Sequence, residues 1–194
     1  MKHLVLALAI SLGLVVPVLG APKSPVQLIE ETKRSMVHVS VPQEDGFYVC
    51  AGFVVSATKG WALTAAHCIK DSEAMMVNGE PSELIAMDEA FAVLSIKPMS
   101  MPPLDIRKSN PKLGEQVVTL GDGYGWFTAF VRHVGAITDE DHFAVDGVII
   151  AGMSGGPVVD EDGKVVGINQ AGDNAVGLMC GATEIRDFLR SIKK

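Results

Sequence analysis

The sequence predicts an all-β protein that ends in a helix. From residue 36 onward, short runs rich in Val, Ile and Phe are punctuated by Gly, Pro, Asp and Asn, and little helical spacing interrupts them. Many short strands separated by turn residues are typical of an antiparallel barrel or sandwich. Residues 183–192 return to helical spacing, with apolar side chains on one face. We therefore expect a β-core with a terminal helix, capped by Thr183, packed against it.

The individual strands are predicted where β-branched and aromatic residues run between turn signals. The expected strands are Met36–Val41, Gly52–Val55, Ala90–Ile96, Gln116–Leu120, Phe127–Val134, Phe143–Ile150, Pro157–Val159 and Val165–Ile168. Asp162-Gly163 suits a hairpin turn between the last two strands. The proline-rich segment Pro98–Pro111 has no strand pattern, and we expect it to connect two β halves.

The first residues have the pattern of an export signal. Lys2 precedes an apolar run from Leu4 to Val18, and residues with small or medium-sized side chains follow before Ala21. This run of about fifteen apolar residues is shorter than the roughly 20 that a membrane-spanning helix needs. We expect a cleaved signal and export to the periplasm or the cell exterior. An uncleaved anchor is the alternative, and only that alternative would give the protein a membrane partner.

The chain divides into three expected segments. Residues 1–20 form the signal peptide or anchor, residues 21–35 a helical or linker segment, and residues 36–194 the functional domain with its terminal helix. Within the second segment, Ser24 is suited to cap a helix that has Pro25 at its first position.

The composition excludes some function classes. Charged residues make up 20% of the chain, the formal net charge is -7, and Lys and Arg form no long basic run. Because proteins bind nucleic acid largely through cationic contacts to phosphates, we expect no nucleic-acid partner. His133 and His142 lack paired Cys or Glu at metal-ligand spacing, so we expect no metal and no cofactor.

Three cysteines in an exported chain allow one disulfide and one remaining thiol. Cys50 and Cys68 lie in strand-like segments that could pair. Such a bridge would contribute on the order of 3 kcal/mol by constraining the unfolded chain. Cys180 lies in an apolar stretch, and we expect it to be a small buried thiol.

The segment Gly152-Met-Ser-Gly-Gly-Pro157 is a candidate nucleophile loop. Glycines around a serine let a substrate backbone approach closely and leave backbone N–H groups free to donate. The N–H groups of Gly152 and Ser154 are then candidates for an oxyanion hole, in which each donor is worth about 3–4 kcal/mol. Taken alone, however, glycine-serine-glycine is also a common loop composition.

The segment Trp61-Ala-Leu-Thr-Ala-Ala-His-Cys68 places a histidine at the end of an apolar strand. A serine needs a neighbouring base to become a nucleophile, and histidine exchanges its proton near neutral pH. Together the two segments predict that His67 acts on Ser154.

These two segments resemble the histidine and serine motifs of trypsin-like peptidases. Cys50, followed by Ala-Gly-Phe-Val54, resembles the partner half of the disulfide that flanks the histidine in that family. The order of these motifs and the sequence around them are closer to the bacterial high-temperature-requirement protease domain than to digestive trypsins. The resemblance covers roughly residues 36–185 and includes no PDZ domain.

The resemblance implies two six-stranded antiparallel β-barrels with the site between them. His67 would come from the first barrel and Ser154 from the second. It also implies that the strand Asn169-Gln170-Ala171-Gly172 pairs with the substrate backbone, as in edge-strand recognition of peptides. Val148, six residues before the serine, would line a specificity pocket for small or medium apolar side chains.

The sequence identifies the third residue of the triad less directly. Members of the family carry an aspartate just before a strand of the form Asp-hydrophobic-Ala-Val-Leu, and aligning Phe91-Ala-Val-Leu94 with that strand puts Ala90 at the aspartate's position. A shift of two residues keeps the same face of the strand and makes Asp88 the acid, although Glu89 then stands at a normally apolar position. We expect Asp88 to complete the triad. The alternatives are Glu89, a Ser–His dyad without an acid, and an inactive site.

The sequence therefore predicts an exported serine endopeptidase that cleaves protein or peptide substrates through an acyl-enzyme. The alternative is a catalytically impaired scaffold of the same fold that binds peptides. An α/β-hydrolase is excluded because no histidine follows Ser154 in the chain. Met153 replaces the acid that precedes the serine in trypsin-type zymogens, so activation through that ion pair is not expected. The sequence leaves the oligomeric state open.

Overall fold

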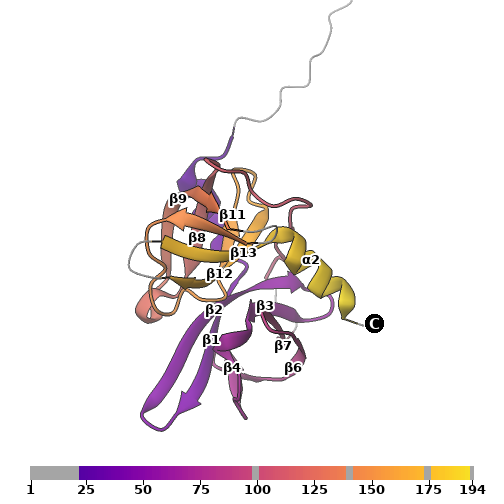
Figure 1. Cartoon of the computed structure of the whole chain (residues 1–194). Helices are drawn as coiled ribbons and strands as arrows, with labels where there is room; N and C mark the ends of the chain where they lie inside the picture. Colours follow the sequence, from indigo (N-terminus) through magenta and orange to yellow (C-terminus); the bar gives the residue numbers. More distant parts are fainter. Residues whose placement is uncertain (1–21, 98–100, 139–141, 173–175, 193–194) are drawn as a thin grey trace, which may run out of the picture.

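The chain folds into two β units that lie against each other, with the helix α2 (Ala182–Ser191) along their boundary (Figure 1). The structure, a computed structural model, describes residues 22–97, 101–138, 142–172 and 176–192. The predicted signal peptide lies outside these ranges. None of the helices in the described ranges has the length and apolar character needed to cross a membrane.

The first unit is a seven-stranded antiparallel sheet in the order β5-β4-β1-β2-β3-β7-β6. Its strands are β1 (Met36–Gln43), β2 (Gly46–Ser56), β3 (Trp61–Ala65), β4 (Met75–Val77), β5 (Glu80–Ser82), β6 (Leu84–Met87) and β7 (Phe91–Ser95). The all-β prediction is confirmed, but this half is not the closed six-stranded barrel that was expected. The edge strands β5 and β6 have only three and four residues and do not pair with each other, so the sheet stays open.

The second unit is a closed six-stranded barrel in the order β10-β13-β12-β11-β8-β9, as expected. Its strands are β8 (Gln116–Gly121), β9 (Thr128–Ile137), β10 (His142–Asp146), β11 (Pro157–Val159), β12 (Val165–Gly172) and β13 (Val176–Gly181). A short 3-10 turn, η2 (Gly123–Gly125), follows β8. Gly163 adopts φ +82° in the predicted turn between β11 and β12, and its N–H donates to the Asp160 carbonyl at 2.9 Å.

The helix α1 (Pro25–Lys33) begins as predicted, because Ser24 and Gln27 form a reciprocal capping box. The terminal helix begins differently. Its cap residue is Gly181, and Thr183 lies inside the helix, where its N–H donates to the side chain of Asn110 at 3.0 Å. The linker between the units therefore satisfies one of the terminal N–H groups of the helix.

The connection between the units contacts both of them. Leu104 donates its N–H to Val54 of the first unit at 2.9 Å, and Arg107 donates to Val165 of the second at 2.9 Å. The Arg107 guanidinium also binds the carboxylates of Glu115 and Asp160. The expectation that the segment ending at Pro111 connects two β halves is confirmed for its described residues, which begin at residue 101.

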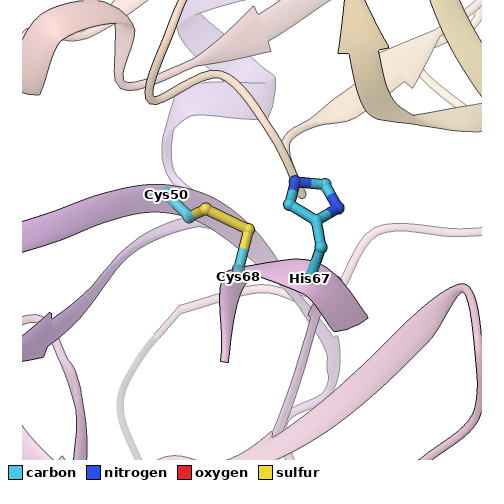
Figure 2. Close-up of side chains that lie close together, drawn as sticks. All are labelled: Cys50, His67 and Cys68. Atoms are coloured by element: carbon cyan, nitrogen blue, oxygen red, sulfur yellow. A yellow bond between two sulfur atoms is a disulfide. The ribbon is translucent and has the colours of Figure 1, made fainter. Parts of the chain in front are cut away.

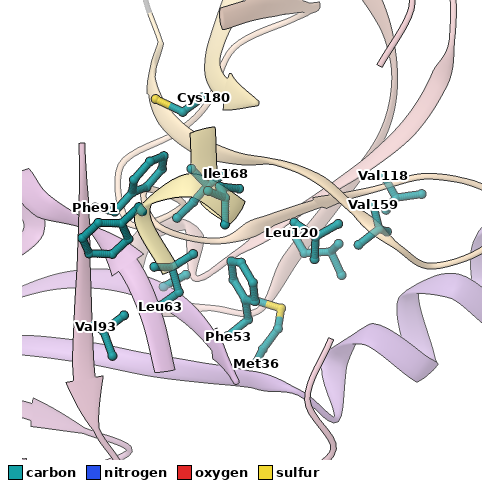
Figure 3. Packing of buried hydrophobic residues seen from close by; sticks show 14 of the residues in the cluster. Met36, Phe53, Leu63, Phe91, Val93, Val118, Leu120, Val159, Ile168 and Cys180 are labelled. Carbon is teal, nitrogen blue, oxygen red and sulfur yellow. The ribbon is translucent and has the colours of Figure 1, made fainter. Parts of the chain in front are cut away.

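One apolar cluster spans the boundary between the two units (Figure 3). Phe53 and Leu63 enter it from the open sheet, and Leu120 and Ile168 enter it from the barrel, each with 0% exposure. The helix α2 covers one side of this cluster through Phe188, whose ring lies 5.5 Å from that of Phe91. The two units thus share a core in addition to the separate cores that each encloses.

The loop before β11 also packs onto the first unit, at Gly155. A Cβ atom at this position would lie 2.3 Å from the Ala51 carbonyl oxygen and 2.3 Å from the Thr64 hydroxyl. Gly155 also has φ +79°, a conformation that side-chain-bearing residues rarely adopt. Only glycine therefore lets this loop reach the sheet.

Replacing Gly155→Ala should lower the free energy of unfolding far more than the same change at Gly114. Gly114 has a similar φ of +82°, but nothing lies within 4 Å of its missing Cβ. Gly114→Ala should therefore cost only the backbone strain of about 1–2 kcal/mol. Gly155→Ala adds two steric clashes and should cost about 2 kcal/mol more than that control. Urea unfolding curves of both variants measure the difference, and equal losses would contradict the packing described here.

Candidate active site

His67 stands on a short turn that a disulfide attaches to the neighbouring strand. β3 ends at Ala65, and the 3-10 turn η1 (Ala66–Cys68) carries the histidine. Cys68 is bonded to Cys50 of β2 with a Cα–Cα distance of 6.1 Å. Figure 2 shows the imidazole projecting from the turn beside this disulfide. The ring nitrogen and the two sulfurs lie within 4.8 Å of one another, but the sulfurs are bonded to each other and are not available to a metal.

Ser154 stands on the loop between β10 and β11. Gly152 opens this loop with φ +94°, and a Cβ atom there would lie 2.1 Å from the Asp122 carbonyl oxygen. Met153 is completely buried, and its N–H donates to the Ile150 carbonyl at 3.0 Å. The residue before the serine thus anchors the loop in the barrel core, while Ser154 itself is only half-buried.

Two backbone N–H groups beside the serine are without acceptors. The N–H groups of Met153, Gly155 and Gly156 each donate to a carbonyl oxygen. The N–H groups of Gly152 and Ser154 donate to nothing in the part of the chain that the structure describes. They are the two groups that the sequence indicated as an oxyanion hole. Unpaired donors next to a nucleophile can stabilise the negative oxygen of a tetrahedral intermediate.

Ser154 and His67 meet at Gln170 of β12. The Ser154 carbonyl accepts the N–H of Ala51 at 2.8 Å, which holds the serine loop next to the disulfide strand. The Ser154 hydroxyl donates to the Gln170 carbonyl at 3.2 Å, and the Gln170 side chain lies near enough to the His67 imidazole to raise its pKa. No hydrogen bond joins Ser154 directly to His67 among the described residues.

The surroundings of His67 keep its imidazole neutral. The side chain retains solvent exposure, but the groups packed around the ring remove enough water for burial to lower its pKa below the usual 6.5. The neighbouring Gln170 side chain raises the pKa and is the smaller effect. At neutral pH the ring is therefore unprotonated, which is the state a general base requires.

Neither predicted acid lies against His67. Asp88 uses its Oδ1 atom to accept the N–H groups of Ala90 at 2.9 Å and Phe91 at 2.7 Å, so it closes the turn before β7. Glu89 is exposed. Within the described ranges, no carboxylate oxygen approaches the His67 ring nitrogens to the 4.0 Å of an ion pair.

The predicted substrate-binding residues fall into two groups. Asn169 is buried, and its side-chain nitrogen holds the Leu120 carbonyl at 2.8 Å and the Met153 carbonyl at 3.2 Å, so it supports the serine loop. Val148 is 38% exposed on the loop that leads to the serine. Gln170 and the two residues after it continue β12 past Ile168, the last residue paired with β11.

The edge formed by Ala171 and Gly172 is therefore paired on one side only. Both residues pair with β13, opposite Leu178 and Gly177. On the other side of β12, no strand of the described chain continues beyond β11. A backbone edge of this kind can accept an added peptide strand.

One further cluster has the donor types of a metal site. His142, Cys180 and Glu184 offer ligand atoms that lie within 4.8 Å of one another. Cys180 is a free buried cysteine, as predicted. Burial, assisted by the Glu184 carboxylate, raises the pKa of this thiol well above neutrality, so it stays protonated in the metal-free protein.

Sequence reasoning assigned no function to an ion pair that supports the serine loop. His38 of β1 binds Asp122 with an Nδ1–Oδ2 distance of 3.0 Å, and Asp122 donates its N–H to the Gly152 carbonyl at 3.3 Å. Burial raises the pKa of the Asp122 carboxyl, and His38 opposes this effect. The two residues are 84 positions apart in the chain, so no local pattern could have paired them.

Comparisons with known proteins identify the family. The model of the trypsin-like peptidase domain matches residues 50–168, more than half of the chain. A probable periplasmic DegP-like serine endoprotease of Chlamydia pneumoniae is 31% identical over 137 residues, which cover 62% of this chain and 28% of that protein. The chain spans less than two fifths of the length of the curated relatives it matches first.

Two solved structures extend the likeness to the fold. The serine endoprotease of Yersinia pestis aligns with a TM-score of 0.79 at 24% identity, covering 89% of this chain and 68% of that one. The active form of the Rv3671c protease of Mycobacterium tuberculosis aligns with a TM-score of 0.73 at 25% identity, covering 97% and 94%. With its histidine turn, its glycine-rich serine loop and this fold, the chain belongs to the trypsin-like peptidase family.

Proposed function

We propose that this chain is an exported serine endopeptidase in which Ser154 is the nucleophile and His67 its general base. The observation that carries the proposal is that both residues adjoin Gln170: the serine hydroxyl donates to its backbone carbonyl at 3.2 Å, and its side chain lies near the imidazole, whose pKa it raises. The neutral imidazole and the two unpaired N–H groups beside the serine support the same assignment.

In the first half of the proposed reaction, the Ser154 hydroxyl turns from the Gln170 carbonyl toward His67. Side-chain rotations of this kind are fast compared with turnover. Oγ then forms a bond to the substrate carbonyl carbon while its proton passes to His67. The N–H groups of Gly152 and Ser154 hold the resulting oxyanion. His67 then gives the proton to the leaving nitrogen as the C–N bond breaks, which leaves an ester on Ser154.

In the second half, water attacks that ester. His67 takes one proton of the water as the oxygen bonds to the acyl carbon, and a second tetrahedral oxyanion forms at the same two N–H groups. The C–O bond to Ser154 then breaks, and His67 returns the proton to the serine oxygen. The products are an amine and a carboxylic acid, and the enzyme regains its starting state.

The substrate of this reaction is proposed to be an extended peptide. The edge of Ala171 and Gly172 would pair with the peptide backbone, as the unpaired side of β12 allows. Val148 would contact the side chain that precedes the cleaved bond, and its exposed apolar surface favours small or medium apolar residues.

Export is proposed from three independent features. Residues 1–20 have the charge and apolar pattern of a signal peptide. The Cys50–Cys68 disulfide requires an oxidising compartment to persist. The similar DegP-like protease of Chlamydia pneumoniae is described as periplasmic.

A peptide-binding role without cleavage is the second candidate. It is favoured by the absence of an ion-paired carboxylate at His67 within the described residues and by the serine hydroxyl, which is bonded to the Gln170 carbonyl. In that case the strand edge would hold a peptide and the acyl-enzyme would never form.

A fluorophosphonate probe distinguishes the two candidates. The wild-type protein should form a covalent adduct, detectable by mass spectrometry as one added phosphonyl group. Ser154→Ala should abolish the adduct because the nucleophilic oxygen is lost, and His67→Ala should slow it by about 10²-fold or more because general-base catalysis contributes that much. An adduct on the wild-type protein that survives in Ser154→Ala would refute the assignment, and no adduct on either protein would favour the binding role.

The labelling rate should depend on the protonation of His67. Only the neutral imidazole can accept the serine proton, so the rate falls as the pH drops through the pKa of His67. Because burial lowers this pKa, the midpoint should lie below 6.5 and the rate should remain nearly constant between pH 7 and 8. Rate constants measured between pH 4.5 and 8.5 test this, and a midpoint above 7 would contradict the described environment of the ring.

A further inference from the structure

Gln170 is aimed at the first unit by an irregularity in β12. Asn169 pairs with Met179 of β13, whereas Ala171 pairs with the adjacent Leu178, so Gln170 has no opposite residue. An extra residue of this kind forms a β-bulge, which turns a side chain away from the regular ladder. The bulge directs the Gln170 side chain across the boundary to β7 and η1, where it meets Ala90 and His67.

The Ala90 carbonyl oxygen fixes which end of the Gln170 amide faces the histidine. This oxygen accepts two N–H donors: the backbone N–H of Ala66 at 2.9 Å and the Nε2 atom of Gln170 at 3.0 Å. A carbonyl oxygen only accepts, so the atom next to it must be the amide nitrogen. Ala66 directly precedes His67, and the amide is therefore held beside the imidazole. Its Oε1 atom remains an acceptor there.

We propose that Gln170 is the positioning residue of this site, with its Oε1 atom accepting the N–H of the His67 imidazole in place of a carboxylate. The inference rests on the proposed function for its catalytic meaning. An imidazole that donates from one nitrogen presents the other nitrogen, unprotonated, to the serine. Gln170 thus selects the tautomer and the ring orientation that the base needs.

The position of Gln170 explains how the site accommodates Ala90. The direct alignment with the family puts Ala90 at the position of the aspartate, and here the Gln170 amide donates to the carbonyl of that residue. An amide in the third position orients the histidine as a carboxylate does, and nucleophile–histidine–amide sites exist on unrelated folds. Being neutral, it stabilises the imidazolium less than a carboxylate would, which agrees with the lowered pKa of His67.

The groups around Gln170 do not compete with it for the His67 imidazole. The Cys180 thiol lies near this amide, but burial raises its pKa, so it is uncharged at neutral pH. The Asp88 Oδ1 atom is occupied by two backbone N–H groups. Among the described residues, no ionised group forms an ion pair with His67.

Two substitutions at Gln170 that nearly preserve the side-chain volume distinguish a positioning role from a packing role. Gln170→Leu removes the acceptor, and Gln170→Glu replaces it with a carboxylate. Gln116→Leu, on the exposed side of β8, is the matched control for the loss of a glutamine amide. Circular dichroism and thermal unfolding establish that each variant is folded before it is compared with the wild type.

The first measurement is the pKa of His67 by NMR of the labelled imidazole, which needs no activity. Gln170→Glu should raise it by about one to three units, because an opposite charge within hydrogen-bonding reach stabilises the imidazolium. Gln116→Leu should leave it unchanged. If Gln170→Glu also leaves it unchanged, Gln170 does not contact the ring as proposed, and the inference is wrong whether or not the protein is an enzyme.

The second measurement is the rate of fluorophosphonate labelling at pH 8.5. Gln170→Leu should reduce the rate by roughly 10²-fold, with a smaller effect on the half-saturating probe concentration, because a misoriented base slows the chemical step. Gln170→Glu should retain at least the wild-type rate. Wild-type labelling of Gln170→Leu, or a loss confined to Asp88→Asn, would overturn the proposal.

The two measurements distinguish the two claims. If the wild-type protein is never labelled but Gln170→Glu raises the pKa of His67, the proposed peptidase fails and the contact stands. If labelling depends on Ser154 but is indifferent to residue 170, the peptidase stands and the positioning role fails.

Discussion

The packed boundary between the open sheet and the closed barrel is the constraint on which the rest of the structure depends. Phe53 and Leu63 from the sheet interlock with Leu120 and Ile168 from the barrel, and none of the four retains solvent exposure. Burial of apolar surface contributes about 25 cal/mol per Å², and close packing resists small shifts. His67 and Ser154 stand on different units, so their relative position is set by this shared core.

Polar contacts beside the core position the residues of the candidate site. Ala51, next to the disulfide cysteine, holds the serine loop through its N–H group, and Gly155 allows the loop to approach closely. The His38–Asp122 pair supports the same loop, because Asp122 donates its N–H to the Gly152 carbonyl. Gln170 then accepts the hydrogen bond of Ser154 and lies near His67. The site is therefore built from backbone and neutral groups more than from charges.

The absence of an ion-paired acid at His67 within the described residues has a consequence for reactivity. A neutral imidazole that keeps solvent exposure is available as a base, but the imidazolium that forms during the reaction gains little electrostatic support. A site of this kind is suited to slow cleavage or to prolonged peptide binding. Both outcomes use the same strand edge on β12, and they differ in whether the serine proton is transferred.

The sequence alone determined the β class, most strands of the barrel, the disulfide pair and the two motifs, because these depend on residue periodicity, turn residues and short local patterns. It predicted the α1 cap correctly for the same reason. It placed the cap of α2 at Thr183, two residues after the observed cap Gly181, and the N–H of Thr183 instead donates to Asn110, 73 positions away. Only the tertiary structure decided that the first unit stays open, that Asp88 closes its own turn, and that the Gln170 side chain reaches the Ala90 carbonyl near His67. Each of these depends on which distant backbone groups become neighbours when the two units pack, and no local pattern in the chain encodes that.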